Sequence, residues 1–496
     1  MKRTRTARTL ALSLFAGAFA AAATAGTAPI VGGASFVPDP SFATEGLAIL
    51  QFDDTDALWN EPVRTLAAAD GSYWTLGFAR TGNGGLDQFA IMHLLADGTP
   101  DAGFGTNGQR LVTSAAVQLV DATMDAAGNF YVASIVSGDG ADFMIECFAA
   151  DLTPCAGFGI AGQTRVAFDQ GGPNDDITHH ILIHQNSIYV LGDVDTPATD
   201  GSWDVAIGVA KLDLASGQLD PNFGNVKGLG GRSVFNIDLV ANGGDFSADF
   251  AFSADGTRLI VGGNAQASDP FSGIALQDAI VLGVDPASGQ LDPSFADAGM
   301  QDVPFAVGES IGQFFSVALA VRHNGRIVFA GSYWQDHDGM VNPQVSLIEL
   351  MPDGSLAQDF GDNGVANSLP GYNIEVVGVA ERPGLGDLVV TMQTDGLLPG
   401  DFSGVHQQAV LDYSPNGRTL RSEFARIIPS NAIDTGAASR PVGILVDAQN
   451  RSLMWGWRNW QFVTHPPYIF DRDITVSRFI DSDAIFGNGF SGSYAD

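Results

Sequence analysis

The chain has 496 residues and carries 56 acidic against 23 basic side chains, a formal net charge of −33 at pH 7. This charge argues against nucleic acid and against anionic membrane surfaces as partners. The acidic residues are mostly Asp in Gly-rich stretches, where Asp suits tight turns because its side chain bonds nearby backbone amides.

The first 25 residues have the pattern of a secretory signal peptide. Four basic residues among the first eight precede an apolar run over residues 10–20 and small residues up to Ala25. This order predicts cleavage near Ala25 and a secreted or periplasmic protein. The run is too short to span a bilayer, and no later stretch reaches the roughly 18 apolar residues of a membrane helix. We expect no membrane insertion and a monomeric protein.

A repeated marker divides the rest of the chain. Near copies of Gly-Gln-Leu-Asp-Pro-x-Phe begin at Gly217 and Gly289. Weaker copies keep Asp-x-x-Phe or a relic of it, followed by Gly or Ala. The marker phenylalanines are Phe42, Phe104, Phe158, Phe223, Phe295, Phe360, Phe424 and Phe486. Eight markers bound seven units, and a repeat of this length indicates a closed or stacked array.

Each unit is expected to hold four short strands. In the fifth unit a strand-like run follows the marker, and an Asn324-Gly325 turn joins two strands within residues 318–331. A second turn series, such as Asp353-Gly354, precedes the markers. The pattern predicts an all-β fold, a seven-bladed β-propeller of four-stranded antiparallel blades over residues 37–486. Residues 26–36 and 487–496 are expected to be tails.

The two ends of the repeat predict how the ring closes. After Phe486 only ten residues remain, so the last unit lacks the strand that follows every other marker. Phe42 is followed by a strand-like segment, residues 46–52, that has no preceding unit. We expect this N-terminal strand to complete the last blade, because the pairing removes an exposed edge.

These segments resemble the bacterial delta-60 repeat family of β-propellers. Its pattern combines an Ala-Val-Ala-Val-Gln-Pro-Asp-Gly strand and turn, an Asp-Phe-Ala-Leu strand and a Leu-Asp-x-x-Phe-Gly marker. Residues 318–331 (ALAVRHNGRIVFAG) and 291–295 (LDPSF) match closely. A longer turn at 383–386 and a last marker without Leu-Asp depart from the pattern. The resemblance covers nearly all of 37–486 and implies the fold, but no single activity.

A polar residue is expected before the strand that leads to each marker. These residues are Gln88, Asp142, Asp204, Asp278, Gln344, Gln407 and Asp473. An acceptor in every unit is more typical of a hydrogen bond within the blade than of a binding site.

Two patterns suggest catalysis or metal binding. Residues 308–312 match the Gly-x-Ser-x-Gly elbow of hydrolases, but Ser310 lies between propeller strands and lacks the required helix. We therefore favour an ordinary loop. His179, His180 and His184 share one strand, either as metal ligands or as polar residues of an inner strand, and we favour the second reading.

Calcium is the one cofactor considered, and the two cysteines leave their pairing open. Asp193, Asp195 and Asp200 resemble a calcium loop, although a solvated acidic turn fits the same residues. Cys147 and Cys155 are equally compatible with a local disulfide and with two free thiols.

The ligand site is expected at one end of the central channel. The innermost strand should be the one that ends in the first turn series. Polar residues stand just ahead of it in every unit: Glu61, Gln118, Asp176, Asp245, Gln313, Glu375 and Arg440. Arg440 would pair with Glu61 or orient an anionic group of a ligand. The aromatic residues expected to wall this end are Trp334, Trp457 and Trp460. They suit a sugar or a cationic group, or they merely cover blade edges.

The expected function is a non-catalytic binding or surface-interaction module for a small molecule, a glycan or a protein. The alternative is an enzyme that acts on a carbohydrate or small metabolite, with carboxylates as acid and base. No pair of these carboxylates carries a recognisable motif. A strongly perturbed carboxylate pKa at the mouth would favour the enzyme.

Overall fold

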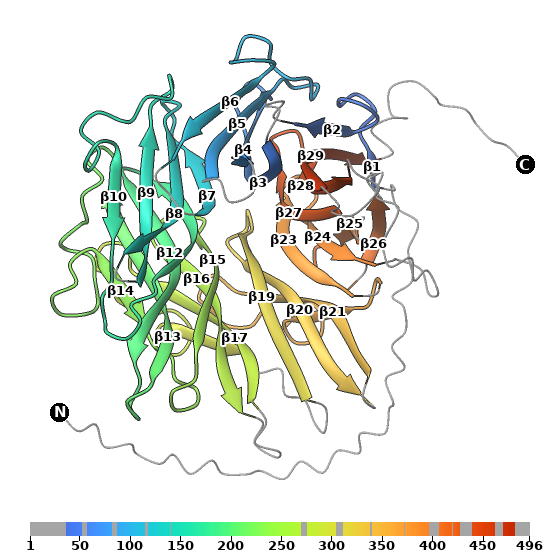
Figure 1. The fold of residues 1–496 in the computed structure, drawn as a ribbon. Coiled ribbons are helices and arrows are strands. Elements are labelled where there is room, and N and C mark those ends of the chain that lie inside the picture. Colours follow the sequence, from blue (N-terminus) through green and yellow to red (C-terminus); the bar gives the residue numbers. More distant parts are fainter. Residues whose placement is uncertain are drawn as a thin grey trace, which may run out of the picture.

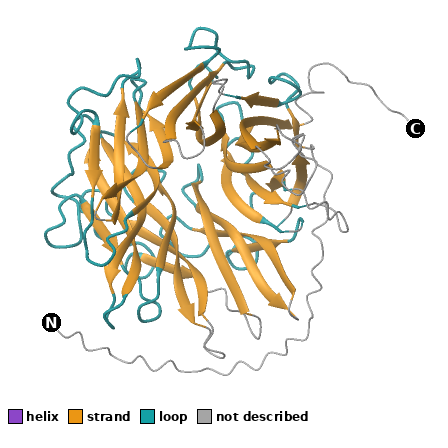
Figure 2. Cartoon of the chain, in the orientation of Figure 1, coloured by secondary structure: helices purple, strands orange, loops and turns teal. Residues whose placement is uncertain are grey.

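The described part of the chain consists of strands joined by turns. The computed structural model describes residues 36–481 except for 52–56, 82–86, 115–117, 139, 269–274, 304–310, 338–339, 372, 396–405, 419, 427–438 and 462–469. Within those residues every named element is a strand (Figure 2), and no helix suited to crossing a membrane is found.

Seven antiparallel sheets form a ring, which is the predicted seven-bladed β-propeller (Figure 1). Blade 1 comprises β3 (Ala57–Ala67), β4 (Tyr73–Thr81), β5 (Asp87–Leu94) and β6 (Gln109–Thr113). Blade 2 comprises β7 (Gln118–Met124), β8 (Phe130–Gly138), β9 (Gly140–Phe148) and β10 (Gln163–Val166). Blade 3 comprises β11 (Ile177–His184), β12 (Ser187–Pro197), β13 (Trp203–Asp213) and β14 (Arg232–Phe235).

The remaining blades follow in chain order. Blade 4 comprises β15 (Asp245–Phe252), β16 (Leu259–Ser268), β17 (Ala275–Val284) and β18 (Met300–Val303). Blade 5 comprises β19 (Ile311–Val321), β20 (Ile327–His337), β21 (Met340–Leu350) and β22 (Val365–Ser368). Blade 6 comprises β23 (Glu375–Arg382), β24 (Asp387–Thr394), β25 (Gln407–Tyr413) and β26 (Leu420–Arg426). Blade 7 comprises β27 (Ser439–Val446), β28 (Ser452–Gln461) and β29 (Phe470–Asp481), joined by β1 (Phe36–Pro38) and β2 (Leu47–Leu50).

The first strand of each blade is the innermost, as predicted. First strands of neighbouring blades contact one another around the ring, for example β15 with β19 and β19 with β23. The turns that end these strands have left-handed backbone, with φ of +85° at Gly71, +69° at Gly256, +83° at Gly325 and +58° at Asn450. Gly adopts this conformation without steric cost, and Asn tolerates it.

The N-terminal strand completes the last blade, which confirms the predicted closure. β2 pairs with β29 from Leu47 opposite Ser477 to Leu50 opposite Ile474. β1 pairs with the same strand further along, starting with Phe36 opposite Asp481. The outer edge of β29 is therefore covered by backbone hydrogen bonds along much of its length.

Buried Arg478 fastens this closure. Its Nε donates to Asp39 Oδ2 at 2.7 Å, its Nη1 donates to the Tyr73 hydroxyl at 3.3 Å, and Nη1 also bonds the carbonyl of Ala96. The guanidinium carbon lies 4.5 Å from the centroid of the Phe42 ring. Asp39 and Phe42 belong to the N-terminal segment, whereas Tyr73 and Ala96 belong to blade 1. One side chain therefore ties blade 7, the closing segment and blade 1 together.

Five of the marker phenylalanines join their blade to the next one. Phe295 is fully buried, and the next residue, Ala296, donates its N–H to the carbonyl of Asp353 in blade 5 at 2.6 Å. A Cβ on Gly354 would come within 2.8 Å of the Phe295 ring, and φ at Gly354 is +86°. We call this contact the phenylalanine–glycine latch. It recurs for Phe42 with Gly98, Phe158 with Gly217, Phe223 with Gly289, and Phe360 with Gly417. The marker and the second turn series are thus the two halves of one contact between blades.

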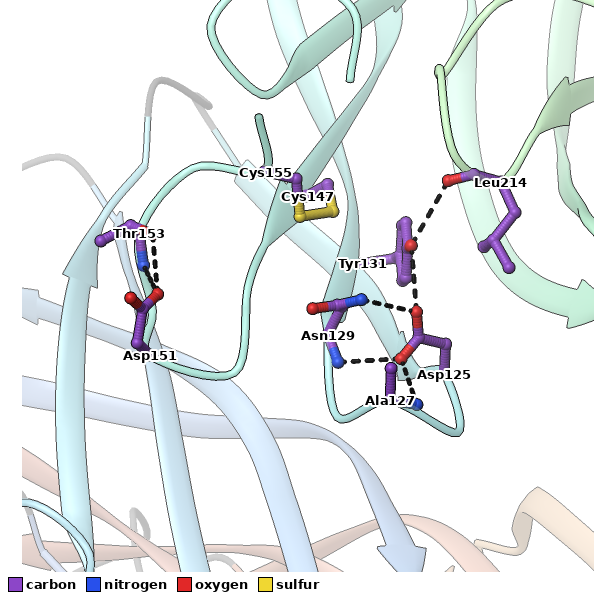
Figure 3. The surroundings of a disulfide bond; sticks show 9 residues. All are labelled: Asp125, Ala127, Asn129, Tyr131, Cys147, Asp151, Thr153, Cys155 and Leu214. Carbon is purple, nitrogen blue, oxygen red and sulfur yellow. Dashed lines mark hydrogen bonds between the residues drawn. A yellow bond between two sulfur atoms is a disulfide. The ribbon is translucent and has the colours of Figure 1, made fainter. Parts of the chain in front are cut away.

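The seam between blades 1 and 2 differs, because Leu152 takes the turn position of the latch glycine, with φ of +69°. Phe104 instead packs its ring against Trp74 of its own blade, with ring centroids 5.1 Å apart. A disulfide spans the same turn and joins Cys147 on β9 to Cys155, with Cα atoms 5.3 Å apart (Figure 3). Of the two alternatives left open by the sequence, the disulfide is therefore the one observed.

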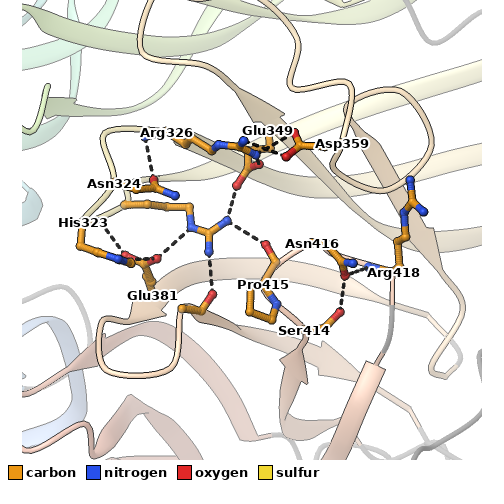
Figure 4. A network of polar contacts seen from close by, with 12 residues as sticks. His323, Asn324, Arg326, Glu349, Asp359, Glu381, Ser414, Pro415, Asn416 and Arg418 are labelled. Atoms are coloured by element: carbon orange, nitrogen blue, oxygen red, sulfur yellow. Dashed lines mark hydrogen bonds and ion pairs between the residues drawn. The ribbon is translucent and has the colours of Figure 1, made fainter.

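A network of ion pairs joins blades 5 and 6 at the end of the ring where the first strands stop (Figure 4). Buried Arg322 donates from Nε to Glu381 Oε1 at 2.9 Å, from Nη2 to the Gly386 carbonyl at 2.6 Å and from Nη1 to the Pro415 carbonyl at 2.8 Å. It also contacts Glu349. These contacts use the guanidinium for cohesion between blades, since a buried charge is tolerated when it is paired and hydrogen-bonded.

The prediction that Asp204 is the equivalent polar residue of the third strand is wrong for blade 3. The N–H of Cys147 bonds the Gly162 carbonyl, and the N–H of Lys211 bonds the Gly231 carbonyl in the same way. Counting back along each strand, Asp142 corresponds to buried Ala206 and not to Asp204, which lies two residues nearer the start of β13.

Candidate ligand-binding site

A β-bulge interrupts every first strand at the same place, and this shared position allows the residues of the seven blades to be compared. The residues that follow the bulge are Arg64, Asp121, His180, Asp249, Ala318, Gly378 and Gly443. We call the residues three positions earlier the mouth positions, because they lie near the end of the ring at which the first strands begin. The mouth positions are Glu61, Gln118, Ile177, Phe246, Phe315, Glu375 and Arg440.

The prediction of seven equivalent polar residues is therefore wrong for three blades. Asp176 and Asp245 each lie one residue before the mouth position, and Gln313 lies two residues before it. The loops that enter the first strands differ in length. Counting residues from the marker phenylalanines therefore does not show which residue of each blade occupies the mouth position. The side chain of Gln313 lies outside the described residues.

The mouth positions divide into an apolar half and a polar half. Consecutive blades 3, 4 and 5 carry Ile177, Phe246 and Phe315, and the two phenylalanines are 41% and 42% exposed. Exposed aromatic side chains at equivalent positions of neighbouring blades are typical of a surface that binds a partner or ligand. The other four blades carry charged or amide side chains at this level.

Two ion pairs lie in the polar half. Arg440 pairs with Glu375 of the preceding blade rather than with Glu61, and both partners are about half exposed. Glu61 pairs instead with Arg472 on β29, whose guanidinium carbon lies 4.0 Å from the centroid of the Trp457 ring. Burial lowers the pKa of Arg472 to about 10. The mouth thus presents donors and acceptors held in place by charge pairing.

The predicted aromatic wall is only partly placed. Trp457 is buried on β28 beneath Arg472, so it supports the polar half and offers little surface to a ligand. Trp334 lies on β20 and Trp460 on β28, but their side chains are outside the described residues. Ser310 also lies outside them.

Asp176 and Asp245 have strongly perturbed carboxyl groups. Burial raises the pKa of each to about 7. Asp176 Oδ2 accepts the N–H of Phe168 at 2.7 Å, and Asp245 Oδ2 accepts the N–H of Ile237 at 2.5 Å. Their exposed fractions are 1% and 0%. Both side chains therefore bind the incoming loop and are not accessible to a substrate.

A second polar layer, which the sequence analysis missed, follows the bulges. Arg64 Nε donates to Asp121 Oδ1 at 2.8 Å, and His180 Nδ1 lies 3.5 Å from Asp121 Oδ2. Asp121 Oδ2 also accepts the N–H of Ile181, as Asp249 accepts that of Leu319, each across a seam. Burial by itself would lower the pKa of His180, but the negative charges of Asp121 and Asp249 raise it above its usual value. Only the alignment of the bulges could have identified this layer.

The histidines and the predicted calcium residues have partners within the protein. His184 stacks on Phe252 with ring centroids 3.7 Å apart, and His179 lies 3.6 Å from Asp193. Asp193 Oδ1 accepts the N–H and hydroxyl of Ser247 at 2.7 Å each.

The other two predicted calcium residues also accept hydrogen bonds. Asp195 accepts the N–H of Asp175 at 3.1 Å, and Asp200 accepts that of Ser202 at 2.9 Å. In the part of the chain that the structure describes, no three His, Cys, Asp or Glu side chains form a ready metal site.

Comparisons with known proteins add solved structures of low sequence identity. No protein-family model and no curated protein sequence matches the chain. The β-propeller domain of the Trilobed protease from Pyrococcus furiosus is 9% identical, covers 86% of this chain and 96% of its own, and has a TM-score of 0.41. An ulvan lyase of a polysaccharide lyase family is 9% identical over 84% of this chain and 94% of its own, with a TM-score of 0.47. The α-L-arabinofuranosidase Arb93A from Fusarium graminearum is 10% identical over 90% and 96%, with a TM-score of 0.34. At these values the likenesses say nothing about the ligand of this chain.

Proposed function

We propose that this protein is an exported, non-catalytic binding propeller, similar to the delta-60 repeat family, whose ligand site is the mouth of the ring. The observation that carries the proposal is that Phe246 and Phe315 are exposed at two neighbouring mouth positions. Glu375, Arg440 and Glu61 occupy other mouth positions and place charged groups at the same end of the ring. Export rests on the signal-peptide pattern that ends near Ala25.

A saccharide without acidic groups is the ligand class that this mouth suits best. The faces of Phe246 and Phe315 can stack on the C–H face of a sugar ring, while the ion-paired side chains offer hydrogen bonds to its hydroxyl groups. The formal charge of −33 repels acidic glycans at long range. A small metabolite or a protein segment with one apolar face and one polar edge is the remaining option.

The enzyme alternative has one observation in its favour, the pKa of about 7 at Asp176 and Asp245. A carboxyl group with such a pKa is able to act as a general acid or base. Both groups are buried and bind backbone N–H groups, however, so neither can reach a substrate without a rearrangement of the loop. We therefore keep binding as the function.

The test is a glycan array on the protein without residues 1–25, followed by titration of any saccharide that binds. Phe246→Ala and Phe315→Ala should each weaken binding at least about tenfold, as expected for central aromatic contacts. Leu385→Ala is the matched control, because Leu385 is also exposed but lies in the turn between β23 and β24, at the other end of the ring. Equal binding by both phenylalanine variants, or loss only in the control, would remove the site from the mouth.

A further inference from the structure

A histidine–aspartate pair stands on blade 6 at the mouth end of the ring. Asp395 directly follows β24, and His406 directly precedes β25, the strand that pairs with β24. The mouth position Glu375 lies opposite Gln393 on β24. Asp395 therefore comes two residues beyond the level of the mouth position, and His406 lies beside it at the same end of the blade.

Asp395 fixes which nitrogen of the imidazole carries the proton. His406 Nδ1 lies 2.6 Å from Asp395 Oδ1, and Asn373 donates from Nδ2 to the other carboxylate oxygen. The Asp395 side chain is only 9% exposed. An ionised carboxylate can only accept hydrogen bonds, so Nδ1 must be the protonated nitrogen. In a neutral imidazole of this tautomer, Nε2 is left as a hydrogen-bond acceptor.

The accepting side of this ring is open to solvent. The His406 side chain is 46% exposed, and no partner of Nε2 is found among the described residues. His93 gives the contrast, because its Nδ1 pairs with Asp101 and its Nε2 contacts the Ser72 hydroxyl at 3.0 Å. Both nitrogens of His93 are thus used within the protein. An imidazole that is oriented from behind by a carboxylate and exposed in front is suited to contact a ligand.

The backbone of His406 connects the pair to the polar half of the mouth. Its carbonyl accepts hydrogen bonds from the N–H of Ser439 at 3.2 Å and from the Ser439 hydroxyl at 3.3 Å. Ser439 directly precedes Arg440, which pairs with Glu375. The exposed imidazole therefore adjoins the ion-paired groups of the mouth.

We propose that His406 is a specificity-determining residue of the mouth, whose Nε2 accepts a hydrogen bond from a hydroxyl group of the saccharide. This inference rests on the proposed function and adds a named polar contact to it. Arg440 offers only donors, whereas His406 offers an uncharged acceptor. Asp395 is a positioning residue, since it acts on the ligand only through the tautomer and orientation of the imidazole.

The tautomer is tested first, by proton–nitrogen correlation spectra of the protein with isotope-labelled histidine at pH 8. The signal that is missing from His406→Phe identifies His406, and its Nε2 should have the shift of an unprotonated ring nitrogen. In Asp395→Asn the new amide keeps its oxygen toward the Asn373 donor and turns its nitrogen to Nδ1. The proton should then move to Nε2. A proton on Nε2 in the parent protein would overturn the proposal.

Binding is then measured with the neutral saccharide that the glycan array selects and with its monodeoxy analogues. His406→Phe keeps a ring but removes both nitrogens, so binding of the saccharide should weaken about two- to tenfold, as for one hydrogen bond. One deoxy analogue should bind the parent more weakly but show no further loss in His406→Phe. Asp395→Asn should weaken binding less, because a hydroxyl group can also accept from a protonated Nε2.

The matched control is His323→Phe. The His323 side chain is 54% exposed, and its Nδ1 lies 2.9 Å from Glu381 Oε1, so it is a second exposed histidine oriented by a carboxylate. It lies in the turn between β19 and β20, at the other end of the ring. His323→Phe should therefore bind the saccharide as the parent does.

The outcomes distinguish this inference from the proposed function. Weaker binding by Phe246→Ala and Phe315→Ala, together with unchanged binding by His406→Phe, would overturn the inference and leave the mouth site in place. A further loss in His406→Phe with every deoxy analogue would show that the ring only shapes the surface, and would overturn the inference as well. Absence of binding to any neutral saccharide would overturn the proposed function and this inference with it.

Discussion

The phenylalanine–glycine latch makes a quantitative prediction for Phe295→Ala. The Phe295 ring is fully buried and touches Gly354 of the next blade, while the guanidinium carbon of Arg258 lies 5.3 Å from the ring centroid. Truncating a buried phenylalanine removes its burial energy and leaves a cavity, so we expect a loss of about 3 to 5 kcal/mol in the free energy of unfolding. Urea unfolding followed by tryptophan fluorescence measures this loss.

The matched control is Phe104→Ala. Phe104 is the marker phenylalanine whose neighbouring blade has Leu152 in place of the latch glycine. Phe104 is only partly buried and packs on Trp74 of its own blade, so we expect about 1 to 2 kcal/mol. A loss at Phe104 as large as that at Phe295 would mean that burial within a blade, and not the latch, accounts for the effect.

The latch is tested further by a double-mutant cycle with Gly354→Ala. This substitution alone should destabilise the protein, because its Cβ would come within 2.8 Å of the Phe295 ring and because φ at this position is +86°. In the Phe295→Ala background the clash disappears and only the backbone strain remains. The two losses should therefore sum to more than the loss in the double variant, and strict additivity would refute the direct contact.

Four further outcomes are expected. Cys155→Ser should cost at most about 3 kcal/mol, since the disulfide closes a short loop, and peptide mapping without reductant should show one linked fragment. Because folding raises the pKa of Asp176 and Asp245 from 3.8 to about 7, their contribution to stability should be complete below about pH 4 and be lost as the pH rises to 7, by a few kcal/mol at most. A urea midpoint that increases from pH 4 to pH 7 would contradict this sign. Deleting residues 26–52 should expose the edge of β29 and cause aggregation or a lower melting temperature, and unchanged melting would contradict the closure. Mass spectrometry of exported material should find Gly26 or a close neighbour at the N-terminus, whereas an intact Met1 would contradict cleavage.

The fold could be predicted because its signals are local and repeated. Turn residues such as Gly325 and Gly354 mark strand ends directly, and their spacing around Phe295 and Phe360 defines a blade. Counting strands then predicted the pairing of β2 with β29.

The site was harder to predict because it depends on register. The loops before Ile177 and Phe246 differ in length from the loop before Glu61, so the sequence does not show that these three residues occupy equivalent positions. The adjacent residues Asp176 and Asp245 fitted the expected polar pattern, but their side chains bind the loops. The choice of Glu375 as the partner of Arg440 depends on how neighbouring blades are set against each other. A single sequence does not contain that information.

The closing segment also determines the order of folding. Gln51 donates to Asp473, and these residues are separated by 422 positions along the chain, so joining them costs far more loop entropy than any hairpin within a blade. Contacts of such long range form late and slow the overall reaction. The first strand that the ribosome makes is therefore the last to find its partner, and until then the contacts between neighbouring blades, the latches among them, must hold the arc of six complete blades. Refolding should accordingly show a late phase that reports on Tyr73 and Arg478 after the individual blades have formed.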